Sequence, residues 1–500
     1  MKALIVVRCL PRVAGVLAML FLAVGTKAQA PQAQATPPPP GAPRSVQFPT
    51  PVEKTLPNGL RVIVVERTNT PLVAAQLLIK NGGEVDPPPL SGLANLTADL
   101  LTKGTTSRTA PQIAEAIEAL GGLLESGARW DASQAIVSVT PSKFGAAVEI
   151  LADVVRRPNF KEEEIERLRQ QTLDELSVAL GQPGSIARYV AARVVFGDSP
   201  YGHPLGGTPE SIQRIRRDDI VKMHSTYYRP DNAVLAIAGD ISAKEAFSLA
   251  ERYFGDWKTD TQGPISVAAV QQSAAAKARV LVIDKPDAGQ AAVLVARMGI
   301  ERKDPDYFRG LVANSVLTGY SGRLNQEIRI KRGLSYGAGS ALETRRGVGP
   351  FVASAQTKNE SGAQVASLLL GEVSKLATAP VLENELTPRK AVLIGNFSRN
   401  LETVNGLVAQ VASLALYGLS FDEINRFISN VQSITSNDVQ KFAGARLDAK
   451  GASIIVVGNA KAFLPELRQQ YPDAEVISMA DLDLNSGSLR KTPAARNITK

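Results

Sequence analysis

Residues 92–105, GLANLTADLLTKGT, predict the start of a helix with one face directed into the protein. Asn95 and Asp99 are four residues apart, so both side chains lie on one face of that helix, and Ala98 lies between them. Two side chains one turn apart are the usual arrangement for helical zinc ligands, but zinc prefers imidazole and thiolate. The frame of this helix therefore suits a metal site, and its side chains do not.

The amino-terminal residues predict an export signal. Residues 1–30 begin with three basic side chains, continue in a short apolar run (13–25) and contain small-x-small cleavage candidates around Ala28, Ala30 and Ala35. The run is too short for a comfortable membrane span, so a cleaved signal peptide is expected, with a retained anchor as the alternative. Residues 31–45 are a Pro/Ala-rich spacer. Localisation in the periplasm is the expectation.

Charge and cysteine content narrow the class of protein. The formal net charge is +8, and residues 1–30 supply four of the basic residues and no acids, which leaves +4 for the mature chain. A net charge of +4 is low for a nucleic-acid-binding protein, so no nucleic acid is expected as a partner. The one cysteine, Cys9, lies in the signal region, so an exported chain without disulfides must rely on a large hydrophobic core.

The mature chain repeats itself. The apolar segment 72–82 has a counterpart in 291–299, and AVLAIAGD (233–240) has a counterpart in SIIVVGN (453–459). Similar offsets in both pairs predict two related halves. We expect an N-terminal domain 46–260, a linker 261–278, a C-terminal domain 279–482 and a flexible tail 483–500.

Each half places strands first, then long amphipathic helices such as 111–120 and 161–180, then a closing strand and helix. This order predicts an α+β fold of two homologous α/β-sandwich halves. In each half a mainly antiparallel sheet would carry helices on one face, and the two halves would form a clamshell.

Several short stretches, in the same order and at the same spacing, carry a resemblance to a known family. They are TLPNGLRVIVVE (55–66), NGG (81–83), SGLANLTADLLTKGT (91–105), EALGGLLES (118–126), SPYGHPLGGTPESI (199–212), YYRPDNAVLAIAGDI (227–241) and GYSGRLNQEIRIKRGLSYGAGS (319–340). The chain resembles the pitrilysin/insulinase family of zinc metallopeptidases over almost its whole mature length.

The resemblance identifies the helix at 92–105 as a degenerate zinc motif. Catalytic members carry H-x-x-E-H there; this chain has Asn95 and Asp99 at the two histidine positions and Ala98 at the glutamate position. Glu175 stands where the family has its third ligand. No metal is therefore expected in this chain. An oxygen set holding a hard cation such as Ca²⁺ is the alternative, although it lacks the six or more ligands usually required.

The two histidines do not offer a replacement site. His203 and His224 lie in different segments, and the mature chain has no cysteine to join them. A three-histidine zinc site is thus impossible, and structural roles are expected for both.

The resemblance also assigns substrate-binding residues. Arg329 and Tyr336, seven residues apart in RIKRGLSY, match the pair that catalytic members use to hold the substrate and stabilise the oxyanion. The alternative is that Arg329 pairs with Glu327 or with a neighbouring helix and that Tyr336 packs beneath a strand. Leu124, Glu125 and Ser126 match the strand that pairs with the peptide by adding it as an extra strand, although the family usually has Asn-Ala where Glu125 and Ser126 stand.

Together these features predict a non-catalytic subunit of a heterodimeric zinc metallopeptidase. The expected partners are a homologous subunit with an intact H-x-x-E-H, which would hold the zinc, and a peptide substrate; no membrane span is expected after signal cleavage. The alternative is a catalytically inert peptide-binding or scaffolding protein of the cell envelope.

Overall fold

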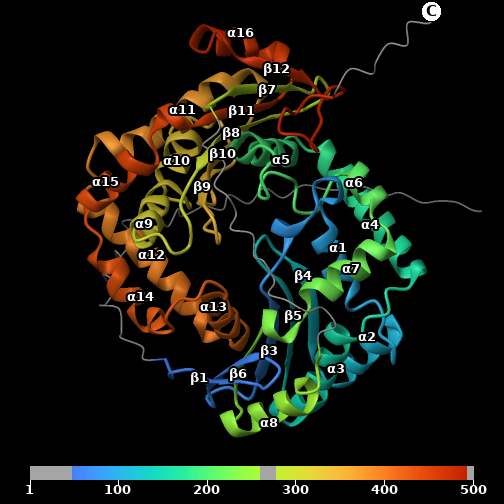
Figure 1. Ribbon diagram of the computed structural model, residues 1–500. Helices are drawn as coiled ribbons and strands as arrows, with labels where there is room; N and C mark the ends of the chain where they lie inside the picture. The colour runs from blue at the N-terminus through green and yellow to red at the C-terminus, as the bar shows by residue number, and fades with distance from the viewer. Residues whose placement is uncertain (1–47, 259–276, 492–500) are drawn as a thin grey trace, which may run out of the picture. The chain divides into compact units, whose positions relative to one another are not determined.

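The computed structural model describes residues 48–258 and 277–491, and the predicted signal peptide, spacer and most of the linker lie outside these ranges. Twelve strands form two six-stranded sheets (Figure 1). The first sheet has the order β1-β2-β6-β3-β5-β4. Its strands are β1 (Val52–Thr55), β2 (Arg61–Glu66), β3 (Val73–Ile79), β4 (Leu123–Ala128), β5 (Ser133–Val139) and β6 (Ala233–Gly239).

The second sheet has the corresponding order β12-β7-β11-β8-β10-β9. Its strands are β7 (Val280–Asp284), β8 (Ala291–Met298), β9 (Ala338–Leu342), β10 (Pro350–Thr357), β11 (Ser453–Gly458) and β12 (Glu475–Ser478). In both sheets a parallel pair (β2 with β6, β7 with β11) is followed by three antiparallel pairings out to the edge strand. The predicted α+β class with two related, mainly antiparallel halves is confirmed.

The sequence repeats correspond to equivalent strands. The segments 72–82 and 291–299 contain β3 and β8, and 233–240 and 453–459 contain β6 and β11. These four strands occupy matching central positions in the two sheet orders. The edge strands β4 and β9 are likewise equivalent.

Helices follow the same plan in both halves. Those of the first half are α1 (Leu93–Leu100), α2 (Ala110–Ala119), α3 (Phe144–Arg156), α4 (Glu162–Gly181), α5 (Pro183–Phe196), α6 (Pro209–Arg214), α7 (Arg217–Tyr227) and α8 (Ala243–Phe254). Those of the second half are α9 (Tyr307–Leu317), α10 (Arg323–Asn325), α11 (Gly362–Thr378), α12 (Glu383–Glu402), α13 (Val404–Leu416), α14 (Asp422–Ser433), α15 (Ser436–Arg446) and α16 (Ala460–Gln470).

In each half, one helix packs on the sheet of the other half. Apolar side chains of α5, among them Ile186 and Val190, form one core with Leu294 and Ile455 of the second sheet. In return, α13 packs on β3 and β6 of the first sheet (Figure 1). A half's own helices thus cover one face of its sheet, as predicted, and the other face is covered by the exchanged helix. This exchange explains why both faces of the central strands are apolar.

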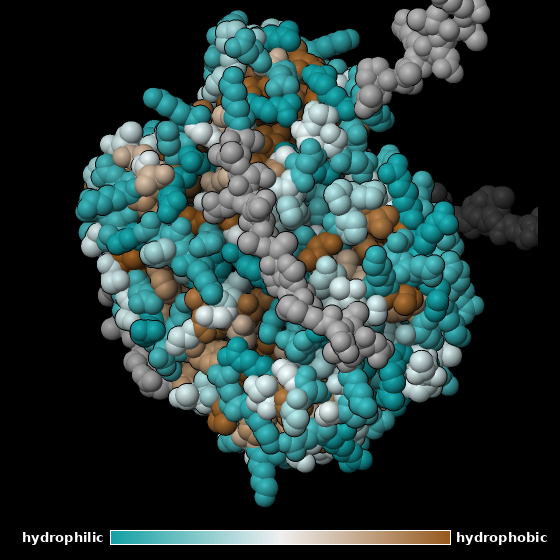
Figure 2. All heavy atoms as spheres, in the orientation of Figure 1, coloured by the Kyte–Doolittle hydropathy of each residue, from teal (hydrophilic) through white to brown (hydrophobic). Residues whose placement is uncertain are grey.

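Hydrophilic residues dominate the surface drawn in Figure 2, and hydrophobic residues appear there in small separate areas. No single helix in ranges 48–258 and 277–491 is both long and apolar enough to cross a membrane. One bent pair, Asn359–Thr378 followed by Glu383–Glu402, meets the requirement by length and composition alone.

The segment after residue 482, predicted as a flexible tail, is packed against α5 as far as the structure describes it. Leu489 is fully buried, and the carbonyl oxygen of Leu484 accepts a hydrogen bond from Nε of Arg193 (2.9 Å). Residues 492–500 lie outside the described ranges.

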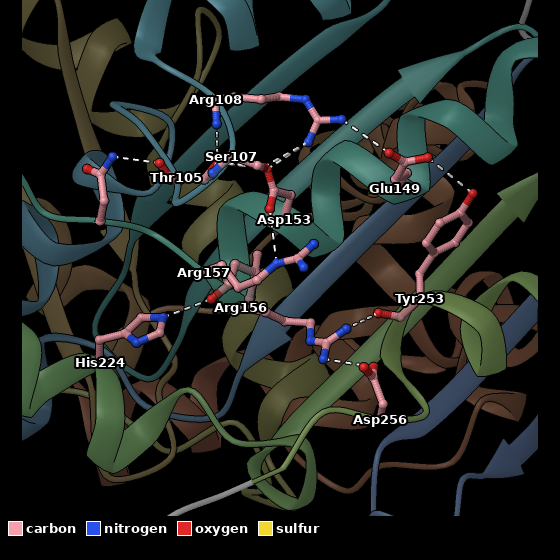
Figure 3. A network of polar contacts seen from close by, with 12 residues as sticks. Thr105, Ser107, Arg108, Glu149, Asp153, Arg156, Arg157, His224, Tyr253 and Asp256 are labelled. Atoms are coloured by element: carbon pink, nitrogen blue, oxygen red, sulfur yellow. Dashed lines mark hydrogen bonds and ion pairs between the residues drawn. The ribbon is translucent and has the colours of Figure 1, made fainter.

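A buried carboxylate fixes the loop that follows α1 (Figure 3). The side chain of Asp153 on α3 has no solvent exposure. Its Oδ2 accepts hydrogen bonds from the hydroxyls of Thr105 (2.8 Å) and Ser107 (2.7 Å) and from Arg108 (2.7 Å), and Arg157 lies 3.1 Å from Oδ1. Burial alone would raise the pKa of Asp153, but these hydrogen bonds outweigh burial and hold the pKa below its usual value.

Candidate functional site

Helix α1 is set in place by a buried aspartate. Oδ2 of Asp86 accepts the backbone N–H of Gly92 (2.7 Å), and Oδ1 accepts that of Ala94 (2.8 Å). Gly92 has φ +92°, a left-handed conformation that strains other residues, and a Cβ there would lie 2.9 Å from the backbone of Gly207. The Asp86 carboxyl group therefore satisfies the first N–H groups of α1, and burial raises its pKa well above the usual value.

The three polar residues at the degenerate zinc positions line one cavity, which we call the polar cavity. Its volume is about 580 Å³, and Asn95, Asp99 and Glu175 are among its lining residues. Asn95 and Asp99 lie on α1, while Glu175 comes from α4 and so reaches the same space from a separate helix. Ala98 is fully buried, so no side chain stands in the cavity where the family's general base would be.

Asn95 and Asp99 are engaged with each other. Nδ2 of Asn95 donates a hydrogen bond to Oδ2 of Asp99 (3.0 Å). Burial raises the pKa of Asp99 to about 6; nearby Lys103 opposes this shift and the Glu175 carboxylate adds to it. Glu175 accepts a hydrogen bond from Nε2 of Gln171 one turn earlier (3.0 Å). The cavity thus holds an internally hydrogen-bonded pair facing a second carboxylate.

This donor set does not fit zinc. The cavity offers the amide of Asn95, which is already bonded to Asp99, and the three acidic residues Asp99, Glu125 and Glu175, with no imidazole or thiolate among its lining residues. Across the described ranges, no group of three or more His, Cys, Asp or Glu side chains is placed to hold a metal ion.

Edge strand β4 forms one wall of the polar cavity. Leu124, Glu125 and Ser126 all line it, and β4 pairs only with β5 in the described sheet. One backbone edge of β4 is therefore directed away from the sheet, next to α1. This is the geometry that addition of a peptide as an extra strand requires.

Arg329 and Tyr336 lie in the second half, around a short π-helical stretch, Gln326–Ile330. Glu327 pairs with Lys331 (2.9 Å) and Arg332 rather than with Arg329. Within the described ranges Arg329 has no ion pair, and its guanidinium lies over the ring of Tyr320 at 5.6 Å. Tyr336 is 89 % exposed. The alternative placements, an Arg329–Glu327 pair and a Tyr336 buried beneath a strand, are not observed.

Tyr336 lines a second and larger cavity of about 780 Å³, which we call the large cavity. Its walls come from α5 of the first half and from β8, β9 and β10 of the second. Tyr189 of α5 lines both this cavity and the polar cavity, so the two are neighbours. Arg329 lines neither of them.

Both histidines have structural environments, as expected. His203 is buried, with Nδ1 3.0 Å from the carbonyl oxygen of Pro204 and Nε2 2.9 Å from that of Gly83. His224 stacks on Tyr228 at 4.6 Å, and its Nε2 lies 2.8 Å from the carbonyl oxygen of Val155. Burial lowers the pKa of His224 to about 4, so it is neutral at physiological pH.

The second half contains a counterpart of the degenerate site that sequence reasoning did not identify. Asn314 and Thr318 are four residues apart at the end of α9, which lies beside β9 as α1 lies beside β4. Oδ1 of Asn314 accepts a hydrogen bond from the hydroxyl of Ser340 (2.7 Å). The hydroxyl oxygen of Thr318 accepts one from the backbone N–H of Ser340 (3.1 Å). The buried Arg389 of α12 lies 3.4 Å from the Thr318 carbonyl oxygen. A cation therefore lies beside this counterpart of the degenerate site.

Fold and site together define a two-half, peptidase-like protein with a degenerate metal position. Models of the insulinase family (peptidase family M16) match residues 61–208, and models of the peptidase M16 inactive domain match residues 214–393. The chain belongs to this family.

Relatives and solved structures are similar to this chain over most of their length. An uncharacterized zinc protease of Rickettsia bellii is 28 % identical over 412 residues, covering 81 % of this chain and 96 % of the relative. An uncharacterized zinc protease of Streptomyces coelicolor is 25 % identical, and the match covers 81 % of this chain and 89 % of the relative. The solved peptidase M16 inactive domain from Pseudomonas fluorescens is 26 % identical, with a TM-score of 0.77, and covers 82 % of this chain and 98 % of that one. A protease from Helicobacter pylori (21 % identical, TM-score 0.76) shares the fold, covering 82 % and 100 %.

Because Asn95, Asp99 and Glu175 line the polar cavity together, restoring the histidines tests whether Glu175 can still serve as a metal ligand. We expect the double variant Asn95→His, Asp99→His to bind one zinc ion per chain, since two imidazoles one turn apart and a facing carboxylate form a three-ligand set. Zinc affinity is measured by competition with a chromophoric chelator. Adding Glu175→Gln weakens binding at least about tenfold; the single variant Asn95→His is the control. A folded double variant without zinc affinity would show that Glu175 cannot reach the two positions.

Proposed function

We propose that this chain is the non-catalytic subunit of a heterodimeric zinc metallopeptidase. Its partner would be a homologous chain with an intact H-x-x-E-H motif, and the partner's zinc would polarise the scissile carbonyl and activate water. This chain would contribute the guanidinium of Arg329 and the hydroxyl of Tyr336 as hydrogen-bond donors to the peptide carbonyl oxygen. A peptide would be the substrate.

The exposure of Tyr336 carries this proposal. A tyrosine with 89 % of its surface in solvent gains little from packing within its own chain. Arg329 is seven residues away, free of ion pairs within the described ranges, and oriented over Tyr320. Two donors suited to an oxyanion are thus presented at the surface of a chain whose own zinc positions have lost their ligands.

The surroundings of this pair support contact with another protein. Large exposed apolar side chains occur in the same segment (Tyr320, Ile330 and Tyr336) and at the start of and along the neighbouring helix α12 (Leu382 and Val392). Ion pairs from Arg323 to Glu385 (2.8 Å) hold the segment against α12. Aromatic and aliphatic side chains beside an arginine are typical of the energetically dominant part of an interface.

A second candidate function rests on the large cavity. At about 780 Å³ it is large enough for several peptide side chains, and through the shared Tyr189 it adjoins the polar cavity, one wall of which is β4. A catalytically inert peptide-binding protein of the cell envelope would use the same two features without a zinc-bearing partner.

Mixing this chain with its H-x-x-E-H homologue distinguishes the two candidates. We expect peptide hydrolysis from the mixture at a rate at least about a hundredfold above either chain alone, with the two chains eluting together, since each supplies groups the other lacks. Peptide binding by this chain alone, without any gain in hydrolysis on mixing, would support the inert binding protein and reject the subunit.

We also propose that the protein acts in the periplasm, on the basis of the signal-like residues 1–30. Fractionation of cells expressing the full chain should recover it with periplasmic markers, shortened at its N-terminus. Recovery of the uncleaved chain with the membrane fraction would favour the retained anchor instead.

A further inference from the structure

A third cavity, away from the zinc positions, has an unusual electrostatic character, and we call it the basic cavity. It has a volume of about 440 Å³, and its lining includes Lys80, Arg302, Lys303, Arg345 and Arg346 but no acidic residue. Five cationic side chains around one space repel one another unless counter-charges compensate them. The partners of each cation therefore decide what this cavity can bind.

The three arginines each have one acidic partner outside the lining. Arg302 pairs with Glu423, Arg345 pairs with Glu343 (2.9 Å), and Arg346 lies 3.2 Å from Glu84. Burial raises the pKa of Glu84 to about 7, so at neutral pH this carboxyl is ionised only part of the time and compensates Arg346 incompletely.

The two lysines, Lys80 and Lys303, lack a direct ion-pair partner in the described part of the chain, ranges 48–258 and 277–491. Lys80 is half-buried at the end of β3, and its pKa is lowered by burial and by the positive charges of Arg61 and Arg346, which the Asp231 carboxylate opposes only in part. Its ammonium group thus lies in a positive field that an added anion would relieve.

Arg345 adds to that field from the wall of the cavity. Its side chain is 6 % exposed and lies over the rings of Trp130 (4.4 Å) and Tyr201 (4.8 Å). Its Nε and Nη1 have no hydrogen-bond partner in the described part of the chain. A buried guanidinium with unused donors is screened little by solvent, and so acts strongly on a neighbouring charge.

The cavity lies where the two halves meet. Lys80 belongs to the first half and the four other cations to the second. The turn that carries Arg345 and Arg346 is anchored on the first half: the Arg346 N–H donates to Oδ2 of Asp131 (2.7 Å), and the Tyr417 hydroxyl donates to the same oxygen (3.1 Å). An anion here would contact both halves at once.

We propose that the basic cavity binds a phosphate-type oxyanion, held by Lys80 and Lys303 and stabilised by the field of the surrounding arginines. Two lysines without ion-pair partners in the described ranges match a dianion in charge, and the volume leaves room for a small ester group. Inorganic phosphate and a phosphate monoester share this chemistry. Binding stabilises the contact between the halves because it removes the repulsion between Lys80 and the second-half cations.

Thermal unfolding of the full chain tests whether the basic cavity binds phosphate. Inorganic phosphate or glycerol phosphate is added, and chloride at the same ionic strength is the reference. We expect a phosphate-dependent rise in Tm of about 3 °C or more, largely lost in Lys80→Ala and in Lys303→Ala. Lys222→Ala is the control: it removes an exposed lysine of α7, and this variant should keep the phosphate-dependent rise in Tm. Calorimetric titration then gives one phosphate per chain for the parent and the Lys222 variant.

Each outcome has a definite meaning. A rise with glycerol phosphate but not with inorganic phosphate supports the site and identifies the ester as its ligand, and the reverse identifies the free ion. Equal Tm values in phosphate and chloride, or a phosphate effect that persists unchanged in both cavity variants, would overturn the proposal.

Discussion

Replacing Tyr336 by phenylalanine is expected to lower kcat of the assembled peptidase by about 10²–10³-fold, the usual cost of losing one oxyanion donor. The hydroxyl is the only group removed, and the ring is 89 % exposed, so the fold and the stability of this chain should not change. KM should change little, because the hydrogen bond is strongest to the developing oxyanion and not to the ground-state carbonyl. Steady-state kinetics of the reconstituted pair measures both constants.

Arg329→Ala should reduce kcat/KM by a similar factor and raise KM as well, since a guanidinium also holds the substrate before the reaction. Arg332→Ala is the matched control: it removes a cation three residues away that is already paired with Glu327. Full activity of Tyr336→Phe and Arg329→Ala in a complex that still assembles would exclude both from the reaction. Loss of assembly in either variant would instead place the pair in the subunit contact.

Asp153→Asn is expected to destabilise the protein by about 3 kcal/mol, the cost of removing one partner from a buried ion-paired network. The amide cannot neutralise Arg108 and Arg157, which both contact the carboxylate in the wild type (Figure 3). Denaturant unfolding at pH 7 measures the difference. Asp256→Asn is the matched control, since Asp256 pairs with Arg156 but its side chain is 78 % exposed, and its loss should cost under about 1 kcal/mol.

The effect of Asp153→Asn should depend on pH in a defined direction. The pKa of Asp153 is lowered in the folded state, whereas in the unfolded chain it is near the ordinary value of about 3.9. Its ionised form therefore contributes its full stability above that value, and the contribution is lost as pH falls through the folded pKa. The difference between wild type and variant should shrink below about pH 4. A constant difference down to pH 3 would show that packing, and not charge, is responsible.

Some features could be predicted because they are local or repeated in sequence. The order of strands and helices in each half follows from hydrophobic patterning, and the equivalence of β3 with β8 and of β6 with β11 follows from similar segments at similar offsets. The loss of zinc chemistry at Asn95, Ala98 and Asp99 also follows from residue type alone, because an amide and a methyl group cannot replace imidazole and a carboxylate base.

Other features depend on which surfaces meet, and periodicity does not specify that. The apolar faces of α5 and α13 predict burial, but nothing in their spacing shows that each packs on the other half's sheet. Leu484 and Leu489 stand in a polar, basic segment that suggests a tail, yet their contacts with α5 bury them. Those contacts join residues almost 300 positions apart, which no local pattern encodes.

Residue identity and order are enough to establish the family, the two-half architecture and the loss of the metal ligands. Three-dimensional contacts are needed to show that Asn95, Asp99 and Glu175 share one cavity, that Tyr336 is exposed while Glu327 pairs elsewhere, and that five cations from both halves surround the basic cavity. Burial, hydrogen-bond partners and the electrostatic field at a side chain depend on neighbours that are distant in sequence, so a local pattern does not specify them.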